Sequence, residues 1–426
     1  MVSSDSRSTL IMTIATINNL AQELLDAIID EVGNFTDFKA PSSERRLGTQ
    51  TLKSCSLVAK TWSPRARQYL FHEVEFTSMD RFTLWQEVIS HGETGPYNFV
   101  QTLHFREKTE QWITSDSFSQ VLQHLVAFPN VENLIFTQYD ITPLVSPLQQ
   151  ASIPFLESIR YLEVDSIAMN THQELLTLVD CFPHLEDLNL GHGRIRRSYE
   201  RGMYPEKAAE RFRGRLYINS REREDDIFLR ELAARPVSFQ EVRVADSPFR
   251  QPLCDLVAAC APTLRRLQVL APSRDSGLTF DGNQNSLLEP LPVERPLVDL
   301  SSCLRLQRLR LSTRNLDILD DWIMPMLYTI TKVPEELTLH ETPMNPSYGI
   351  EHVPGDAWGE VDAHLTALAM KAIEQGHGLE LILTTAMFST PHPEQKFSSR
   401  LSSFAEKGTL TVSRSSPAYS YAKGPF

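Results

Sequence analysis

The chain has 426 residues, 41% of them hydrophobic and 22% charged, which is the composition of a folded protein long enough for two or more domains or for one extended repeat array. Its formal net charge of −13 argues against nucleic acid or an anionic membrane as a partner, because both bind to basic surfaces. No apolar run is long enough to span a bilayer, so we expect no membrane insertion.

The cysteine pattern predicts reduced thiols in an intracellular protein. The five cysteines are odd in number, and most lie inside apolar runs such as 178–182 and 256–261. This distribution argues against a disulfide framework and against a paired CxxC metal site. We therefore expect a cytoplasmic and/or nuclear protein without a cofactor or a metal.

Two short amphipathic helices are predicted near the N-terminus. The first covers residues 20–32, and the second runs from 52 to 71 with an interruption at Pro64. Between them lies a polar connection. The apolar positions at helical spacing are Leu20, Leu24, Leu25, Ile28, Ile29 and Val32 in the first helix, then Leu52, Cys55, Leu57, Val58 and Trp62 in the second.

These two helices resemble the F-box. The first helix of that family reads roughly leucine-proline-x-glutamate-leucine before an isoleucine-rich turn, and a later helix reads leucine-x-x-cysteine-x-leucine-valine and then tryptophan. This chain has Ala21 where the family usually has the proline, so a fixed helix start is absent. The matching residues are Leu20, Glu23, Leu24, Leu25, Ile28 and Ile29, followed by Leu52, Cys55, Leu57, Val58 and Trp62.

The resemblance implies a three-helix F-box-like domain over residues 18–76 that binds a Skp-type adaptor and, through it, a cullin. The residues that it assigns to adaptor binding are Leu20, Leu24, Leu25, Ile28 and Leu57. A simpler interpretation stays open, in which the two helices are ordinary core helices, because apolar stripes at helical spacing are usually core.

A repeated phrase follows the helices. Residues 129–136, 183–190 and 262–269 share a proline and three apolar positions at identical offsets, and a helical apolar run precedes each of them. The proline ends the helix, and the alternating residues after it are typical of a half-buried strand. Thr171 and Glu174 are spaced for a capping box at the start of one such helix. The unit is therefore predicted to be helix, proline and short strand.

Weaker copies of the strand lie between and beyond these phrases, mostly at intervals of about 25 to 31 residues. Near Pro154 the register is ambiguous, because Leu156 and Ile159 fit one face and Leu162 and Val164 fit the other. The pattern resembles the irregular leucine-rich repeats that follow an F-box in the large fungal families, although the usual asparagine is missing from most copies. The expected fold is an α/β repeat, with the leucine-rich-repeat-like solenoid over residues 77–388.

Other segments interrupt or follow this array. Residues 191–226 mix arginines with carboxylates and predict a solvated charged insert, with an anion pocket as the sharper alternative. Residues 272–299 are rich in Pro, Gly, Asn and Ser and predict a surface loop. Residues 389–426 are expected to be a mobile tail.

A basic strip is the candidate target-binding surface. If apolar strand positions face inward, the residues between them lie on an exposed sheet face, and Arg266, Arg308 and Arg310 then stand close together on neighbouring strands. Like charges this close are poorly tolerated without an anion, so we expect the strip to contact an acidic or phosphorylated target. A row of solvated arginines is the equally simple alternative. The other predicted exposed positions include Thr102, Ile135, Asn189, Arg243, Gln268, Thr338 and His340.

No motif in the sequence supports catalysis. It lacks the P-loop, GxGxxG, GxSxG, HExxH and paired CxxC patterns. We expect no enzymatic activity. By resemblance, the chain would be the substrate-recognition subunit of a Skp–cullin–F-box type ubiquitin ligase that acts on an unidentified target protein. The alternatives are a leucine-rich-repeat scaffold that the N-terminal helices merely cap, and an α/β enzyme with an unfamiliar site.

Overall fold

The computed structural model describes residues 22–36, 42–90, 95–106, 114–138, 140–151, 153–191, 193–195, 212–219, 225–245, 250–270, 298–313, 323–341, 355–385 and 393–414. The chain divides into two compact units. One is Met1–Ile135 with Ser152–Ser158, and the other is Phe136–Ala151 with Ile159–Phe426.

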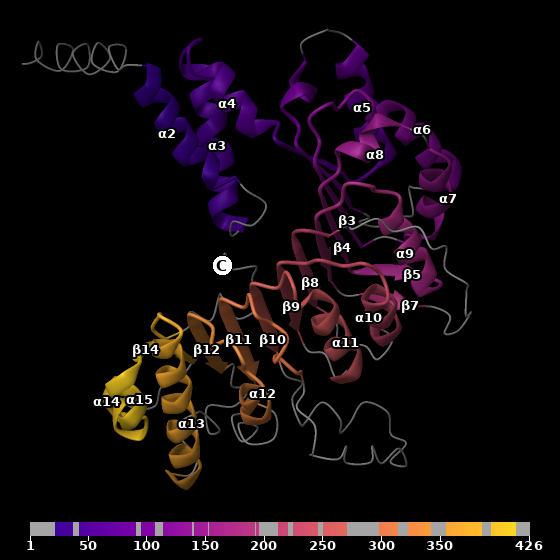
Figure 1. The fold of residues 1–426 in the computed structure, drawn as a ribbon. Coiled ribbons are helices and arrows are strands. Elements are labelled where there is room, and N and C mark those ends of the chain that lie inside the picture. The colour runs from indigo at the N-terminus through magenta and orange to yellow at the C-terminus, as the bar shows by residue number, and fades with distance from the viewer. Residues whose placement is uncertain are drawn as a thin grey trace, which may run out of the picture. The chain divides into compact units, whose positions relative to one another are not determined.

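The first unit begins with helices α2 (Gln22–Asn34), α3 (Ser42–Val58) and α4 (Ser63–Leu70), which Figure 1 shows side by side. Pro64 lies in the first turn of α4, where its missing N–H costs no helical hydrogen bond, so it begins a helix instead of interrupting one. The start of α3 at Ser42 was missed because its first half is polar. The buried core of these helices is Ile29, Leu52, Cys55 and Ala66, with Val32, Trp62, Tyr69 and Leu70 packed against it.

The rest of the first unit is a short stretch of parallel sheet with its helices. Phe76 of the first strand packs against Phe82 at 5.2 Å and against Phe105 at 5.4 Å between ring centroids. Residues 73–76 pair with 102–105 as the first strand of this sheet. They do not belong to the helical domain, which we predicted to extend to residue 76. The elements are β1 (Glu73–Phe76), α5 (Met79–Ser90), the 3-10 helix η1 (Pro96–Phe99), β2 (Thr102–Arg106), α6 (Ser115–Leu125), β3 (Asn133–Thr137), which the division cuts after Ile135, and α8 (Pro154–Ser158).

The second unit is an α/β arrangement whose long parallel sheet has the strand order β4-β6-β8-β9-β10-β11-β12-β13-β14. Figure 1 shows helices α9 to α13 along one side of these strands. This architecture is compatible with a solenoid-like repeat. The strands are β4 (Tyr161–Asp165), β5 (Ile167–Met169), β6 (Asp187–Leu190), β7 (Gly193–Ile195), β8 (Arg215–Asn219), β9 (Glu241–Ala245), β10 (Arg266–Leu270), β11 (Arg308–Thr313), β12 (Glu336–Glu341), β13 (Glu380–Thr385) and β14 (Thr409–Arg414). The helices are α7 (Thr142–Gln150), α9 (His172–Asp180), α10 (Asp225–Ala233), α11 (Arg250–Cys260), α12 (Met324–Tyr328), α13 (Gly355–Glu374), α14 (Pro393–Arg400) and α15 (Ser402–Lys407).

The second residue of each strand in this long sheet is Leu or Val, and the strand register places these residues side by side. Leu267 of β10, for example, lies between Val242 of β9 and Leu309 of β11. Since alternate residues of a strand point to opposite faces, this spacing forms one apolar ladder on the helix side of the sheet. Its buried members are Leu162, Leu188, Leu216, Val242, Leu267, Leu309, Leu337 and Leu381. The same rule settles the ambiguity near Pro154, because Leu162 and Val164 are the buried pair of β4.

The predicted helix start at Thr171 is confirmed in part. The Thr171 hydroxyl accepts a hydrogen bond from the Glu174 N–H at 3.4 Å. The Glu174 carboxylate does not complete a capping box. It accepts from the Asn170 N–H at 2.7 Å and from the Thr142 hydroxyl at 3.0 Å, so it ties the start of α9 to the start of α7.

Two segments that we predicted to be irregular contain strands. Within 191–226, β8 pairs with β6 and β9, and its Leu216 and Ile218 are buried. The charged residues around it hid this short alternation; residues 196–211 and 220–224 lie outside the described residues. The predicted tail from 389 is also wrong for 393–414. These residues form α14, α15 and β14, and Phe397 packs against Trp358 of α13 at 5.8 Å between ring centroids. Most of the predicted loop 272–299 lies outside the described residues.

Among the helices that the structure describes, none has both the length and the apolarity required to cross a bilayer.

Asp362 joins α13 to the start of α15, so replacing it should change the stability of the protein measurably. The buried Asp362 carboxylate of α13 accepts hydrogen bonds from the Phe404 N–H at 2.8 Å and the Ser403 N–H at 3.1 Å, the free donors at the start of α15. We expect Asp362→Ala to lower the free energy of unfolding by about 1–2 kcal/mol. Asp362→Asn keeps an acceptor and should lose less. Urea unfolding followed by tryptophan fluorescence measures both, and equal midpoints for Asp362→Ala and the wild type would contradict the role.

Candidate functional site

The helical residues that we assigned to adaptor binding divide between surface and core. Leu24, Ile28 and Leu57 are 55%, 49% and 86% exposed, whereas Leu25 is 6% exposed. Successive helical residues point about 100° apart, so Leu25 turns toward the core when Leu24 turns toward solvent. Leu25 is therefore a core residue, which corrects its assignment to the surface. Leu20 lies outside the described residues.

Further apolar side chains are exposed on the same helices. Leu47 and Val58 of α3 are 66% and 65% exposed. Leu47 was missed because it lies in the polar first half of α3, while Val58 belonged to the motif but was not chosen as a contact residue. Exposed apolar groups that gather on one small module indicate an interaction surface. We call Leu24, Ile28, Leu47, Leu57 and Val58 the apolar helix surface.

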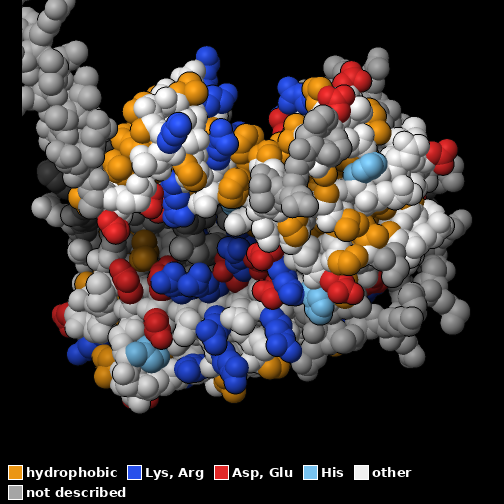
Figure 2. All heavy atoms as spheres, turned by 90° about the horizontal axis from the view of Figure 1, so that it is seen from above, with side chains coloured by type: hydrophobic (Ala, Val, Ile, Leu, Met, Phe, Trp, Pro, Cys, Tyr) orange, Lys and Arg blue, Asp and Glu red, His pale blue; other side chains and the backbone are white. Residues whose placement is uncertain are grey.

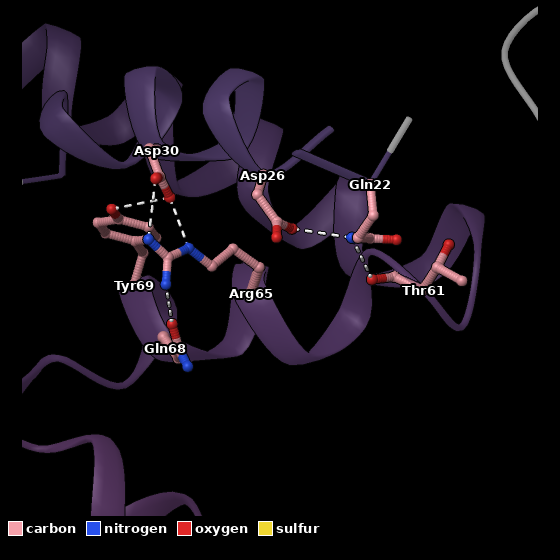
Figure 3. Close-up of polar contacts among 7 residues, drawn as sticks. All are labelled: Gln22, Asp26, Asp30, Thr61, Arg65, Gln68 and Tyr69. Atoms are coloured by element: carbon pink, nitrogen blue, oxygen red, sulfur yellow. Dashed lines mark hydrogen bonds and ion pairs between the residues drawn. The ribbon is translucent and has the colours of Figure 1, made fainter. Parts of the chain in front are cut away.

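A polar cluster fixes α2 against α4 (Figure 3). The Arg65 guanidinium donates to both carboxylate oxygens of Asp30, at 2.6 and 2.8 Å, and to the Gln68 side chain at 2.9 Å. The Tyr69 hydroxyl donates to the same Asp30 carboxylate at 3.0 Å. The Arg65 hydrogen bonds lower the pKa of Asp30 below its usual value. Because the pair is more than one third exposed, its contribution to stability is at most about 1 kcal/mol.

A second set of polar contacts is made by the first residue of α2. The Gln22 amide at the start of α2 donates to the Asp26 carboxylate at 2.8 Å and to the Thr61 carbonyl at 3.5 Å (Figure 3). The start of α2 therefore lies beside the residues that follow α3.

On the sheet of the second unit, the first residues of the strands form a charged row in which acids and bases are neighbours (Figure 2). Each arginine of this row has a carboxylate on an adjacent strand: Arg215 bonds to Asp187 at 2.6 Å, Arg266 to Glu241 at 3.6 Å and Arg308 to Glu336 at 3.3 Å. The charged row consists of Asp187, Arg215, Glu241, Arg266, Arg308 and Glu336.

The predicted basic strip is therefore divided. Arg266 and Arg308 do stand opposite each other, as expected, but both are ion-paired. Arg310 lies two residues further along β11, where its neighbours are Gln268 and Thr338. The ion pairs of Arg266 and Arg308 were not predicted, because their partners Glu241 and Glu336 begin strands that carry the weaker copies of the repeat.

Arg310 belongs to an inner row formed by the third residues of the strands: Glu163, Asn189, Tyr217, Arg243, Gln268, Arg310 and Thr338. Arg243 and Arg310 flank Gln268, and the Arg243 guanidinium lies 4.6 Å from the centroid of the Tyr217 ring. Burial, and then the charge of Arg243, lowers the pKa of Arg310. The buried Nε of Arg310 and the buried Oε1 of Gln268 have no hydrogen-bond partner.

The opposite end of the inner row is internally satisfied. The Tyr161 hydroxyl donates to the Glu163 carboxylate at 2.5 Å and accepts from the Asn189 amide at 3.1 Å. Burial, and then the Glu163 charge, raises the pKa of Tyr161, so this phenol stays protonated. By contrast, β10 and β11 carry buried polar atoms without a hydrogen-bond partner, namely Gln268 Oε1, Arg310 Nε and Ser312 Oγ.

Several sheet positions that we predicted to be exposed are buried. Strands about 4.8 Å apart let side chains of equal register shield one another, so polar side chains in the middle of a strand lose contact with solvent. The buried positions are Thr102, Ile135, Asn189, Gln268, Thr338 and His340. His340 lies beside Ser312 and Thr384 and hydrogen-bonds the Thr384 hydroxyl through Nδ1.

Groups suited to metal or thiol chemistry are not assembled in the described part of the chain. It contains no cluster of three or more His, Cys, Asp or Glu residues that could hold a metal ion. None of the five cysteines, all of which lie within the described residues, forms a disulfide, and burial raises the pKa of the Cys303 thiol to about 11.

Comparisons with known proteins add little. No protein-family model matches the chain, and no curated protein matches it. Five solved chains match, among them a Bacteroides fragilis protein from a structural genomics programme, with 10% sequence identity and a TM-score of 0.31. That match covers 80% of this chain and 73% of the bacterial one, and a likeness this distant carries no functional information.

His340 should make stability depend on pH. Burial, and then the charges of Arg310 and Arg243, lowers its pKa from 6.5 to about 4. Between these values the unfolded chain binds a proton that the folded chain does not, so stability is present above pH 6.5 and falls as the pH drops toward 4. We expect the wild type to lose about 2 kcal/mol more than His340→Gln between pH 7 and pH 5. Urea unfolding at both pH values tests this, and the same loss in both proteins would contradict it.

Proposed function

We propose that the chain is a non-catalytic recognition subunit of a Skp–cullin–F-box type ubiquitin ligase. Its N-terminal helices would bind a Skp-type adaptor and, through it, a cullin, while its sheet would bind a target protein. The observation that carries the proposal is the apolar helix surface, where Leu24, Ile28 and Leu57 are exposed beside a core that is already complete without them. Burying such side chains is favourable, and a protein partner provides the burial.

The division of the F-box-like residues supports this proposal. Leu25, Ile29, Leu52 and Cys55 are buried, so folding alone explains why these four motif residues are apolar. Folding does not explain the apolar character of the exposed motif residues Leu24, Ile28, Leu57 and Val58. Binding to a partner is one reason for such residues to be apolar, and adaptor binding is the role that the resemblance implies.

The sheet is the proposed target-binding half. Its ladder of Leu and Val residues at fixed register resembles leucine-rich repeats, and the opposite face offers rows of polar and charged side chains. A recognition subunit needs no chemistry of its own, because it accelerates transfer by holding the target near a conjugating enzyme. An α/β enzyme gains no support from any residue cluster described above.

One observation favours a scaffold that the N-terminal helices only cap. Helices α2 to α4 belong to the same compact unit as β1 and β2, and α4 contacts η1. Terminal repeats of an array need such a cover. Deletion of residues 22–71 distinguishes the two roles, since a cap is needed for the remainder to stay folded and a separate adaptor-binding module is not.

The adaptor proposal is tested by Leu24→Ala/Ile28→Ala, which shortens two exposed side chains one turn apart on α2. We expect full-length protein to co-purify with a recombinant Skp-type adaptor and the variant to bind it about thirtyfold more weakly, a loss of about 2 kcal/mol. Both side chains are about half exposed, so the melting temperature should change little.

The matched control is Leu84→Ala/Val88→Ala, a pair with the same spacing and with 60% and 44% exposure on α5. It should keep adaptor binding. Leu25→Ala, by contrast, should lower the free energy of unfolding by about 2–5 kcal/mol because it opens a cavity. A wild type that does not bind the adaptor, or a Leu24→Ala/Ile28→Ala variant that binds it equally well, would refute the adaptor role.

A further inference from the structure

The arginines of the charged row have ion-pair partners on adjacent strands, whereas Arg310 of the inner row lies between two neutral side chains, Gln268 and Thr338. The carboxylates of Asp187, Glu241 and Glu336 are each held by an arginine of the charged row. Two residues further along the strands, Arg243 of β9 and Arg310 of β11 stand on either side of Gln268, with no carboxylate at that level on β9, β10 or β11. Two arginines thus stand two strands apart, with a neutral amide on the strand between them.

Arg310 is held in an unfavourable environment. Its Nε is buried without a hydrogen-bond partner, and a buried charge normally requires one. The nearby Oε1 of Gln268 and Oγ of Ser312 are also buried and unpartnered. The Ser312 hydroxyl can donate, and a half-turn of the Gln268 amide presents its NH2 group instead of its oxygen. All three side chains can therefore donate toward one acceptor.

We propose that Arg310, Gln268 and Ser312, with Arg243 across β10, form a binding site for one oxyanion, a phosphate or carboxylate group carried by a segment of the target protein. The planar guanidinium group matches these anions because its N–H donors lie parallel to two of their oxygens. An anion at this site accepts hydrogen bonds from the donors that lack acceptors. Its negative charge also reduces the repulsion between Arg243 and Arg310.

The ligand class follows from the surroundings. The half-buried Tyr217 beneath the Arg243 guanidinium provides further contact surface along the row, which suits an extended peptide better than an isolated ion. The inference rests on the proposed target-binding role of the sheet. It is independent of the adaptor, because every residue in it belongs to the second unit.

The first experiment measures binding of inorganic phosphate to the full chain, from the rise in melting temperature in sodium phosphate relative to sodium chloride at equal ionic strength. We expect phosphate to stabilise the wild type and Arg310→Gln to weaken the binding at least about tenfold. Without phosphate, Arg310→Gln should melt no lower than the wild type, because it removes a half-buried charge whose Nε has no hydrogen-bond acceptor.

Arg308→Gln is the matched control, since Arg308 lies on the same strand and face but is ion-paired with Glu336. It should lower the basal melting temperature slightly and keep the phosphate effect. An equal phosphate effect in all three proteins, or none in the wild type, would overturn the site. Should Arg310→Gln not fold, Arg243→Gln replaces it, with the same expected loss of phosphate binding.

A second experiment identifies the source of the anion. A phosphoserine-oriented peptide library and its unphosphorylated, glutamate-containing counterpart are passed over immobilised wild type and Arg310→Gln. Retention of either library by the wild type and its loss in the variant support a peptide ligand, and the library retained assigns phosphate or carboxylate. Binding of free phosphate with retention of neither library would overturn the peptide assignment. Adaptor binding is not part of either measurement, so failure of the proposed ligase role would be visible separately.

Discussion

In-register parallel pairing is the constraint on which the second unit depends. Each strand offers its second residue to the same ladder, so Leu267 must meet Val242 and Leu309, and any polar residue there would interrupt a continuous apolar core. The same rule acts on the other face. At the first position, each of the two arginines that stand opposite each other on β10 and β11 has a carboxylate on its other neighbouring strand, Glu241 for Arg266 and Glu336 for Arg308.

The inner row shows what happens when this compatibility fails. Its Tyr161, Glu163 and Asn189 end is closed by hydrogen bonds within the row and beside it, and nothing there calls for a ligand. Beside Arg310 the neighbours in register, Gln268 and Thr338, are neutral, and burial together with the charge of Arg243 outweighs the attraction of Glu336. Proteins that retain an unfavourable group of this kind usually use it in binding or catalysis. The N-terminal helices show the apolar equivalent, since Leu57 is left in solvent by a core that Leu52 and Cys55 already complete.

The repeat was predictable where its signals were strong. The phrases at 129–136, 183–190 and 262–269 located β3, β6 and β10, because a proline after an apolar helix and before alternating leucines has few other meanings. Strands β8 and β14 were missed, since the short alternation at 215–219 is masked by flanking charges and the one at 409–414 lies among Ser- and Pro-rich segments that are typical of a tail. The surface was less predictable. Sequence periodicity chose Arg266, Arg308 and Arg310 equally, but only strand register distinguishes the arginines that have acidic neighbours from the one that has none.

Asp362 gives the array a property that its helices and strands alone would not provide. In a stack of repeats each unit contacts only its neighbours, so the terminal unit is the first to open and strand separation can proceed inward from it. The Asp362 carboxylate on α13 accepts two hydrogen bonds from the first turn of α15, the helix that immediately precedes β14. Opening of β14 therefore cannot proceed as simple fraying of one strand: it requires the helix before it to release a buried carboxylate. The consequence is that the end of the sheet behaves as part of a cooperative unit with α13, and its amide protons should exchange with solvent at rates closer to those of the interior strands than to those of a loose terminus.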